Sequence, residues 1–307
     1  KIWLRTKIEK DKRDIQGLIK TGKINVKKLE ELLKKTGFEK YFDFSIKEIY
    51  PKWRDGLRAA LQVIEREHKV DWFLGDDFQG RSFNEYDAIL TWTDSQDRVV
   101  DALPKRIRKG IILTTMPYDI ENLQKYQIVF CESKPVYKVV RANGLNGIHA
   151  FGTDTDLFSP DERVEKDILY FYPATFSPWK RQRDIVHYRA GLWCIGTVQP
   201  DGLEDLQACQ NNGVHVEVGY FDVTYIRDLY RRAQNIPIPA VHGSERTVLE
   251  AMSMDLIPQI NPENQKAYSF LNEFINSHHE SPRAFVEQKY SARRYARRIL
   301  EGLRIYD

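Results

Sequence analysis

Residues 148–160 (IHAFGTDTDLFSP) decide how this chain is divided. A short strand-like run reaches a turn at Gly152, and an Asp-x-Asp-x-Phe-x-Pro segment follows it. Asp, Ser and Pro favour turns, so this segment interrupts any regular element. It lies near the middle of a chain of 307 residues, where two halves of similar size would meet. The stretch therefore predicts a joint between two domains.

The composition is that of a globular protein. Hydrophobic residues make up 42% of the chain, and the mean hydropathy is −0.54. No apolar run reaches the roughly 20 residues needed to span a bilayer, and the charged residues 1–12 lack the apolar core of a secretory signal. Three dispersed cysteines, Cys131, Cys194 and Cys209, favour free thiols in a reducing compartment. We expect a cytoplasmic protein.

Positive charge is concentrated at the two ends of the chain. Residues 1–40 hold 13 Lys and Arg against 6 Asp and Glu, and residues 281–307 hold 7 against 3. One interpretation is a pair of solvated helical faces. The other is a basic surface, mainly in residues 1–40, for an anionic acceptor such as nucleic acid or a lipid surface, to which the protein would bind peripherally.

Strand patterns alternate with helix patterns along both halves. In the first half we predict strands at 1–7, 71–74, 86–92, 111–114 and 128–131, and helices at 25–36, 54–67, 95–107, 120–125 and 134–142. In the second half we predict strands at 168–172, 192–196, 214–218, 238–241 and 256–260, and helices at 181–189, 225–233, 247–254 and 291–303. This alternation predicts two doubly wound α/β domains, in which ligands bind beyond the carboxyl ends of the strands.

Residues 239–252 (PAVHGSERTVLEAM) form a second motif of strand, glycine turn and helix N-terminus. This motif resembles the "PS..EgfGlvvLEAMa" block of the retaining GT-B glycosyltransferases, the glycogen synthase and sucrose synthase-like family (glycosyl transferases group 1). Residues 148–160 resemble the joint between the two domains of that family. The resemblance is specific over about residues 128–260.

The resemblance implies a GT-B fold, with two Rossmann-like doubly wound domains facing across a cleft. Residues 1–158 would form the acceptor-side domain, and residues 159–283 the domain that binds the nucleotide-sugar. Residues 284–307 would form a C-terminal helix that packs back toward the first domain.

The second motif supplies most of the implied site. A helix N-terminus offers free N–H groups and the positive end of the helix dipole to a diphosphate. The resemblance implies that the residues binding the donor in this way are Gly243, Ser244, Glu245, Arg246 and Thr247. It makes Glu250 the ligand of the ribose hydroxyls, although the position alone also fits a surface helix residue.

One position of this motif departs from the family. His242 stands where the family has a glutamate that contacts the transferred sugar. A histidine can donate a hydrogen bond to a sugar hydroxyl but cannot replace a carboxylate. Glu245 is the alternative for that role.

Residues 174–183 (ATFSPWKRQR) resemble the family's "gR...eKg" loop. Lys180 matches its lysine, a cation that would stabilise the departing diphosphate. Thr175 stands where the family has arginine, and Arg181 or Arg183 would substitute for it. Gly219 matches a turn near the nucleotide.

The first half matches the family only in architecture. Ser133 fits the start of its last helix, and Tyr118 and Asp119 are candidates to face the sugar or the acceptor. Asp154 and Asp156 resemble a metal motif, but their place in the joint favours turn chemistry. We therefore expect no metal and no cofactor other than the nucleotide-sugar co-substrate.

The sequence thus predicts a retaining transferase that moves a sugar from a nucleotide-sugar to an unknown acceptor. Thr175 and His242 leave open an inactive GT-B-like binding or assembly subunit. A third alternative is a glycosyltransferase that acts on modified bases in nucleic acid.

Overall fold

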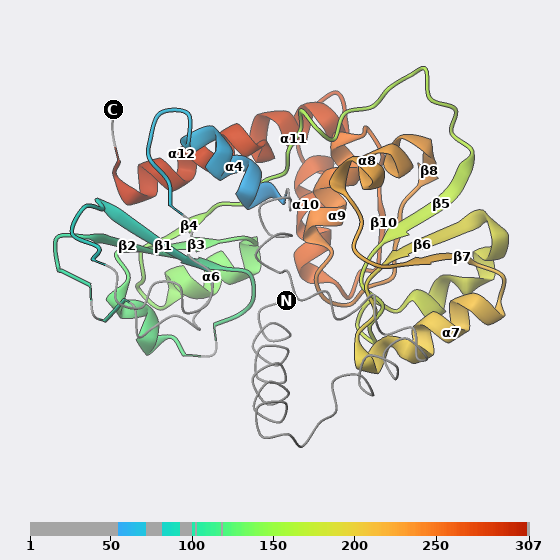
Figure 1. Ribbon diagram of the computed structural model, residues 1–307, viewed down its shortest axis with the longest axis horizontal. Coiled ribbons are helices and arrows are strands. Elements are labelled where there is room, and N and C mark those ends of the chain that lie inside the picture. Colours follow the sequence, from blue (N-terminus) through green and yellow to red (C-terminus); the bar gives the residue numbers. More distant parts are fainter. Residues whose placement is uncertain (1–54, 72–81, 93–99, 102, 118, 306–307) are drawn as a thin grey trace, which may run out of the picture. The chain divides into compact units, whose positions relative to one another are not determined.

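The computed structural model describes residues 55–71, 82–92, 100–101, 103–117 and 119–305, and residues 51–307 form one compact unit (Figure 1). The elements predicted at 1–7 and 25–36, and residues 72–74 of the strand predicted at 71–74, lie outside the described residues. The basic region 1–40 lies outside them as well. Among the described residues, no helix is both long enough and apolar enough to cross a membrane.

The first half contains a parallel sheet in the order β1-β2-β3-β4. Its strands are β1 (Ala88–Trp92), β2 (Arg108–Leu113), β3 (Ile128–Cys131) and β4 (Gly147–His149). Residues that alternate along β2 and β3 are buried on opposite faces: Ile112 and Phe130 join one core, whereas Ile111 and Val129 join another. Both faces of this sheet are therefore covered, as in a doubly wound fold.

Different helices cover the two faces of the first sheet. α4 (Gly56–Ile64) and α12 (Ala292–Leu303) pack together and fill one core through residues such as Leu57 and Ile299. α6 (Lys134–Ala142) and the 3-10 helix η4 (Glu121–Lys125) cover the other face through Val136 and Leu123. The last helix of the chain thus belongs to the core of the first half.

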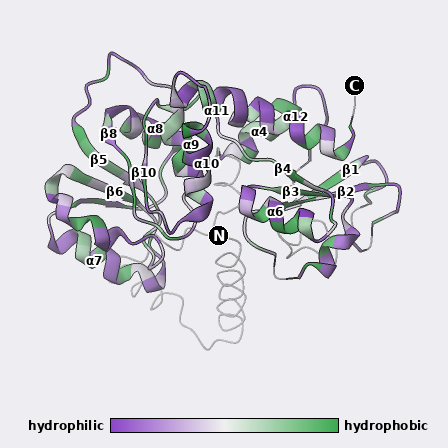
Figure 2. Cartoon of the chain, turned by 180° about the vertical axis from the view of Figure 1, so that it is seen from behind, coloured by the Kyte–Doolittle hydropathy of each residue, from purple (hydrophilic) through white to green (hydrophobic). Residues whose placement is uncertain are grey.

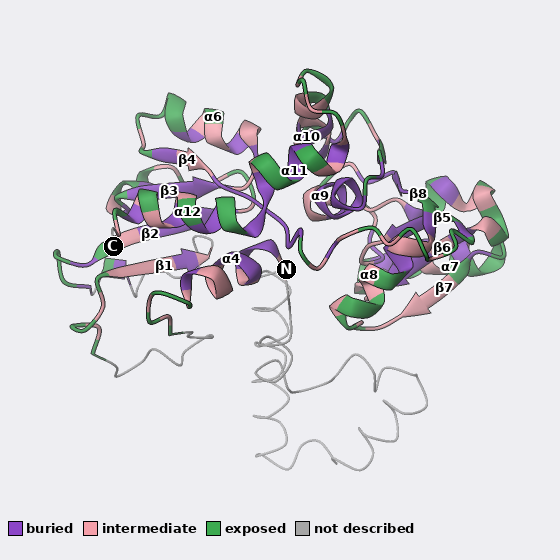
Figure 3. Ribbon diagram, turned by 90° about the horizontal axis from the view of Figure 1, so that it is seen from above, coloured by how far each residue is buried: buried purple, intermediate pink, exposed green. Residues whose placement is uncertain are grey.

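The second half repeats the parallel pattern. Its sheet has the order β7-β6-β5-β8, and β9 pairs with β10. The strands are β5 (Ile168–Pro173), β6 (Leu192–Gly196), β7 (His215–Val218), β8 (Ala233–Asn235), β9 (Pro237–Ile238) and β10 (Gln259–Ile260). Apolar residues run along the central strands of both halves (Figure 2). β3 and most of β6 are buried, whereas the edge strands β1 and β7 are mainly intermediate in exposure (Figure 3).

The helices of the second half surround its sheet. They are η5 (Gln182–Gly191), η6 (Pro200–Gly202), α7 (Leu203–Asn211), α8 (Val223–Arg232), α9 (Glu245–Ser253), α10 (Gln265–Ile275) and α11 (Pro282–Tyr290). One continuous core joins them, in which the Tyr230 ring meets Phe158 and Phe171 edge to face. Phe158, from the joint segment, is 1% exposed and anchors that segment in the core.

Three of the predicted helices differ from the structure, and the one predicted at 120–125 is the 3-10 helix η4. Residues 104–107 form turns rather than the end of a helix, because Pro104 has no N–H to donate. The segment predicted as a helix at 181–189 is the 3-10 helix η5, and Arg189 within it has a left-handed backbone. The strand predicted at 238–241 is confined to β9.

Candidate functional site

The loop that follows β5 places Lys180 near the carboxyl end of the sheet. The Gln182 side chain is fully buried, and its amide donates to the carbonyls of Ala174 and Thr175. The Thr175 hydroxyl lies 2.9 Å from that of Thr197, which follows β6. These contacts tie the loop to the neighbouring strand end. They fix the backbone from which Lys180 projects.

Lys180 reaches the N-terminus of α9, more than 60 residues further along the chain. Its ammonium donates to the Ser244 hydroxyl at 2.8 Å and to the His242 carbonyl at 3.3 Å. The Tyr172 hydroxyl lies 3.3 Å from the same Ser244 oxygen and donates to the Lys180 carbonyl. Lys180 is therefore held at both its backbone and its side chain.

The turn before α9 requires an unusual backbone. Gly243 and Ser244 both have left-handed φ angles, of 70° and 72°. A Cβ atom at Gly243 would lie 2.8 Å from the Lys180 Nζ, so glycine serves both the turn and the approach of the ammonium. The Asn264 side chain donates to the Gly243 carbonyl at 2.8 Å and secures the turn from α10.

This turn combines two sources of positive potential. The first-turn N–H groups of α9 carry the positive end of the helix dipole, and the Lys180 ammonium lies beside them. The pKa of Lys180 is lowered to about 8, mainly because the side chain is buried; the Glu245 carboxylate acts to raise it, and the Arg246 cation acts to lower it. An anion bound here would favour the charged lysine and gain from both sources.

Glu250 lies in the second turn of α9 and is 4% exposed, so it is not a surface helix residue. One carboxylate oxygen accepts a hydrogen bond from the Tyr230 hydroxyl at 3.1 Å. The other lies 3.2 Å from the Arg246 Nε, and the Arg246 side chain remains 35% exposed. Two partners on separate oxygens fix the plane of this carboxylate.

The two residues considered for the sugar-contacting role lie on either side of the turn. His242 has an exposed side chain, and its carbonyl rather than its ring contacts Lys180. Glu245 begins α9, with its carboxylate near Gly243. The structure thus brings Lys180, the turn at Gly243 and Ser244, and Glu245 together.

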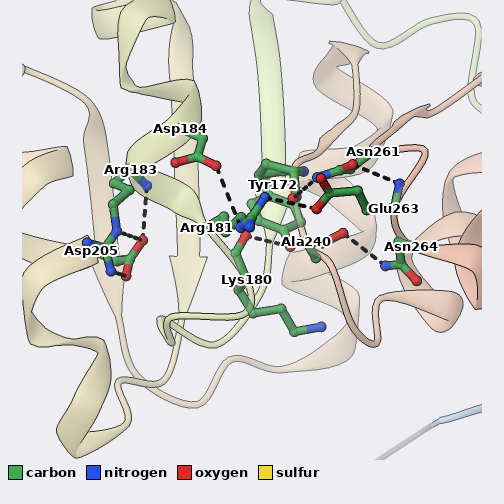
Figure 4. A network of polar contacts seen from close by, with 11 residues as sticks. Tyr172, Lys180, Arg181, Arg183, Asp184, Asp205, Ala240, Asn261, Glu263 and Asn264 are labelled. Carbon is green, nitrogen blue, oxygen red and sulfur yellow. Dashed lines mark hydrogen bonds and ion pairs between the residues drawn. The ribbon is translucent and has the colours of Figure 1, made fainter.

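The two arginines proposed to replace the missing motif arginine point elsewhere. Arg181 pairs with Glu263 at 3.3 Å, and Arg183 pairs with the buried Asp205 at 3.0 Å. Figure 4 shows both pairs, with the Lys180 ammonium turned away from them. Arg183 therefore links η5 to α7. Arg181, which is about 38% exposed, is held by a surface ion pair.

The other predicted residues lie at element ends. Gly219 follows β7 and donates its N–H to the Gly196 carbonyl. Thr247 is buried in α9, and its carbonyl accepts a long bond from the Tyr230 hydroxyl. Asp119 is exposed and accepts a hydrogen bond from the Asn122 N–H of η4.

Ser133 stands at the start of α6. It is 1% exposed, and its hydroxyl has no hydrogen-bond partner among the described residues. Tyr118, proposed with Asp119 to face the sugar, lies outside the described residues.

Asp154 and Asp156 take part in local contacts of the joint. Asp154 accepts from the Leu157 N–H at 3.0 Å, and Asp156 lies 3.5 Å from Arg293. Within the described ranges, no group of three or more His, Cys, Asp or Glu side chains could hold a metal ion.

Sequence reasoning did not single out Tyr172, Tyr230 or Glu132. Glu132 follows β3, and burial raises its pKa well above the ordinary value, with Asp55 and Glu245 adding to the rise. Strongly shifted carboxyl groups concentrate at functional sites. Tyr172 and Tyr230 are core residues whose hydroxyls contact Ser244 and Glu250, respectively. No linear motif distinguishes them from other core aromatics.

The comparisons with known proteins agree with this architecture. The sequence matches no protein-family model and no curated protein. Among solved structures, it is similar to HepE of Anabaena in complex with UDP and glucose, with a TM-score of 0.51, 13% identity, and coverage of 80% of this chain and 81% of HepE.

Two further structures show the same similarity. Apo OtsA gives a TM-score of 0.52 at 8% identity, with 82% of this chain and 77% of OtsA covered. A trehalose-6-phosphate synthase gives 0.53 at 10% identity, with 76% of each chain covered. All three neighbours are GT-B glycosyltransferases. The chain therefore has the α/β GT-B fold that these enzymes share, built from two Rossmann-like domains.

Proposed function

We propose that this chain is a retaining glycosyltransferase that takes a sugar from a nucleoside diphosphate sugar. The observation that carries the proposal is the Lys180 ammonium, held 2.8 Å from the Ser244 hydroxyl at the N-terminus of α9. Two segments of the second half converge there on a spot suited to a diphosphate. HepE, a protein of similar fold, was solved with UDP and glucose, and the trehalose-6-phosphate synthase neighbour transfers a glycosyl group with retention.

The proposed roles follow from the charges of the reaction. When the bond between sugar and diphosphate breaks, positive charge develops on the sugar and negative charge on the departing oxygen. Lys180 and the N–H groups of α9 would stabilise the diphosphate. Glu250 would accept hydrogen bonds from the ribose hydroxyls, and His242 or Glu245 would orient the sugar.

We further propose that the transfer requires no metal ion and no cofactor. Lys180 and the helix dipole supply, at the diphosphate, the positive charge that a divalent cation supplies elsewhere. Transfer that continues at the same rate in the presence of EDTA would support this part of the proposal. A rate restored only by added magnesium or manganese would count against it.

A thermal-shift screen with UDP-, GDP-, ADP- and TDP-sugars tests the proposed donor. A ligand that binds only the folded protein raises the melting temperature by mass action. We expect one nucleotide series to raise it, and Lys180→Ala to abolish the rise. The product's anomeric configuration, read by NMR, then tests retention.

A second candidate function is a GT-B-like binding subunit without activity. Two observations favour it. Thr175, which stands where the family has an arginine, is hydrogen-bonded to the Thr197 hydroxyl. The His242 side chain is exposed, and its ring does not contact Lys180. If a nucleotide-sugar raises the melting temperature but is neither hydrolysed nor transferred, this second function is the correct one. For the acceptor we propose an anionic molecule, either a lipid surface or a nucleic acid.

A further inference from the structure

A pocket of about 550 Å³ lies on α11 and α12, and it shares no residue with the candidate donor site. Nearly all of its lining residues are charged: Gln288, Lys289, Arg294, Arg297, Arg298 and Glu301. Four cations and one carboxylate give the lining a formal charge of +3. This is the basic C-terminal region whose role the sequence left open.

The amphipathic pattern of α12 brings these cations together. Tyr295, Ile299 and Leu303 turn into the core that α12 shares with α4 and β2. Residues 294, 297, 298 and 301 occupy another face of the helix because they are spaced three and four apart. The buried face holds the helix in place, so its cationic face is presented on a fixed support.

The positive charge of the pocket is only partly neutralised. Arg297 pairs with Glu301 at 2.7 Å. Lys289 lies 3.7 Å from Glu273, but that carboxylate is already held by Lys134 at 2.6 Å. Arg294 forms no side-chain ion pair with any described residue of the chain.

Arg298 provides a separate sign of a missing acceptor. Its guanidinium lies over the Tyr290 ring, 5.9 Å from the ring centre. Its Nη1 is buried and has no hydrogen-bond partner among the described residues. A buried cationic donor without an acceptor is unfavourable. Arg298 also lines the pocket, and the other donors of its guanidinium are available to an anionic oxygen there.

A larger polar groove adjoins the pocket. Gln288 and Lys289 also line a groove of about 950 Å³ formed with α6 and α10. That groove offers amide and hydroxyl groups, including Asn272, Asn276 and Ser269. A ligand anchored at Arg294 and Arg298 could extend past Lys289 into polar surroundings.

We propose that the pocket between α11 and α12 binds a phosphate group, carried either by a phosphorylated solute or by an anionic lipid headgroup. Arginine suits phosphate because its planar fork of donors can bond two oxygens at once. Arg294 and Arg298 supply the contacts, and Lys289 adds charge at the border with the larger groove.

Isothermal titration of the full chain with inorganic pyrophosphate tests the site. The titration uses a Lys180→Met background, which removes the lysine of the candidate donor site. We expect one binding event that weakens about tenfold or more in Arg294→Gln, because each charge-assisted hydrogen bond contributes roughly 1.4 kcal/mol or more. Binding should also weaken as salt is added.

Arg293→Gln is the matched control. Arg293 precedes Arg294 on the same helix, is 72% exposed and pairs with Asp156 outside the pocket. Because Arg294 is also exposed, its replacement is not expected to disturb folding. Arg298→Gln should weaken binding further, and its melting temperature shows whether the variant is folded.

Vesicles distinguish the two sources of phosphate. Co-sedimentation with phosphatidylglycerol vesicles, but not with phosphatidylcholine vesicles, would assign the pocket to a lipid headgroup if it too depends on Arg294. Binding of pyrophosphate without vesicle binding would assign it to a phosphorylated solute. The proposal is overturned if neither probe binds, or if Arg293→Gln and Arg294→Gln behave alike.

Discussion

The affinity for the diphosphate is expected to depend on the charge of Lys180. Burial lowers its pKa to about 8, so the ammonium is fully present below that pH and is lost as the pH rises through it. We expect the affinity for a nucleoside diphosphate, measured by isothermal titration, to fall from about pH 7 to about pH 9. In Lys180→Arg, whose guanidinium stays charged, the affinity should not vary over this range.

The lowered pKa of Lys180 makes the affinity fall as the pH rises, but it makes the free energy of unfolding increase. Between about 8 and the ordinary lysine pKa, the unfolded chain binds more protons than the folded one, so this lysine makes the folded state more stable as the pH rises. Weaker binding without unfolding would therefore identify loss of the Lys180 charge as the cause. An affinity that stays constant in the native protein would contradict the role given to Lys180.

Tyr230 is expected to position Glu250. Tyr230→Phe keeps the ring in the core but removes the hydroxyl that donates to the Glu250 carboxylate at 3.1 Å. We predict a loss of about 1 kcal/mol in the free energy of unfolding, measured with urea. If Glu250 binds ribose, the affinity for the nucleotide should fall too, while the affinity for pyrophosphate stays the same. Tyr188→Phe, whose ring stacks on Tyr170 outside the site, is the control.

The turn that begins α9 can be tested against a second glycine turn. Gly243 has a φ of 70° and Gly213 a φ of 73°, but a Cβ at Gly213 would meet nothing within 4 Å. Alanine should cost about 1–2 kcal/mol of stability at either position, because both backbones are left-handed. Only Gly243→Ala should also displace Lys180 and weaken diphosphate binding. Equal binding by the two variants would show that the close approach of Lys180 is unimportant.

Elements with a strong local pattern could be predicted from the sequence, and others could not. β3 and β6 lie where their apolar runs predict them, at Ile128–Cys131 and Leu192–Gly196. α7 was not predicted, because its inner face buries Asp205, and that charge is compensated by Arg183 from a distant segment. A pattern based on hydrophobicity does not detect such a face.

The sequence motifs identify part of the candidate site. Lys180, Gly243 and Ser244 are near one another, as two separate motifs led us to expect. The outward turn of Arg181 toward Glu263 was not predictable, since it depends on where α10 begins. Neither was the contact between Tyr230 and Glu250, which joins two helices of the core.

At the scale of the whole molecule, the last helix belongs to the core of the first half. Ile299 of α12 is 1% exposed and shares that core with Leu57 of α4 and Ile112 of β2. Ile299→Ala should therefore cost about 2–5 kcal/mol, because it leaves a cavity where two distant segments meet. Arg297→Ala, on the exposed face of the same helix, should change stability by less than about 0.5 kcal/mol.

Hydrogen exchange can separate a shared core from a loosely attached helix. If α12 completes the first core, Ile299→Ala will reduce amide protection in α4, β2 and β3 as well as in α12, since these elements would open as one unit. β5 and β6 have a different core and should keep more of their protection. Faster exchange confined to α12 would mean that the first half is stable without it, because its sheet would then rely on α6 and its own strands.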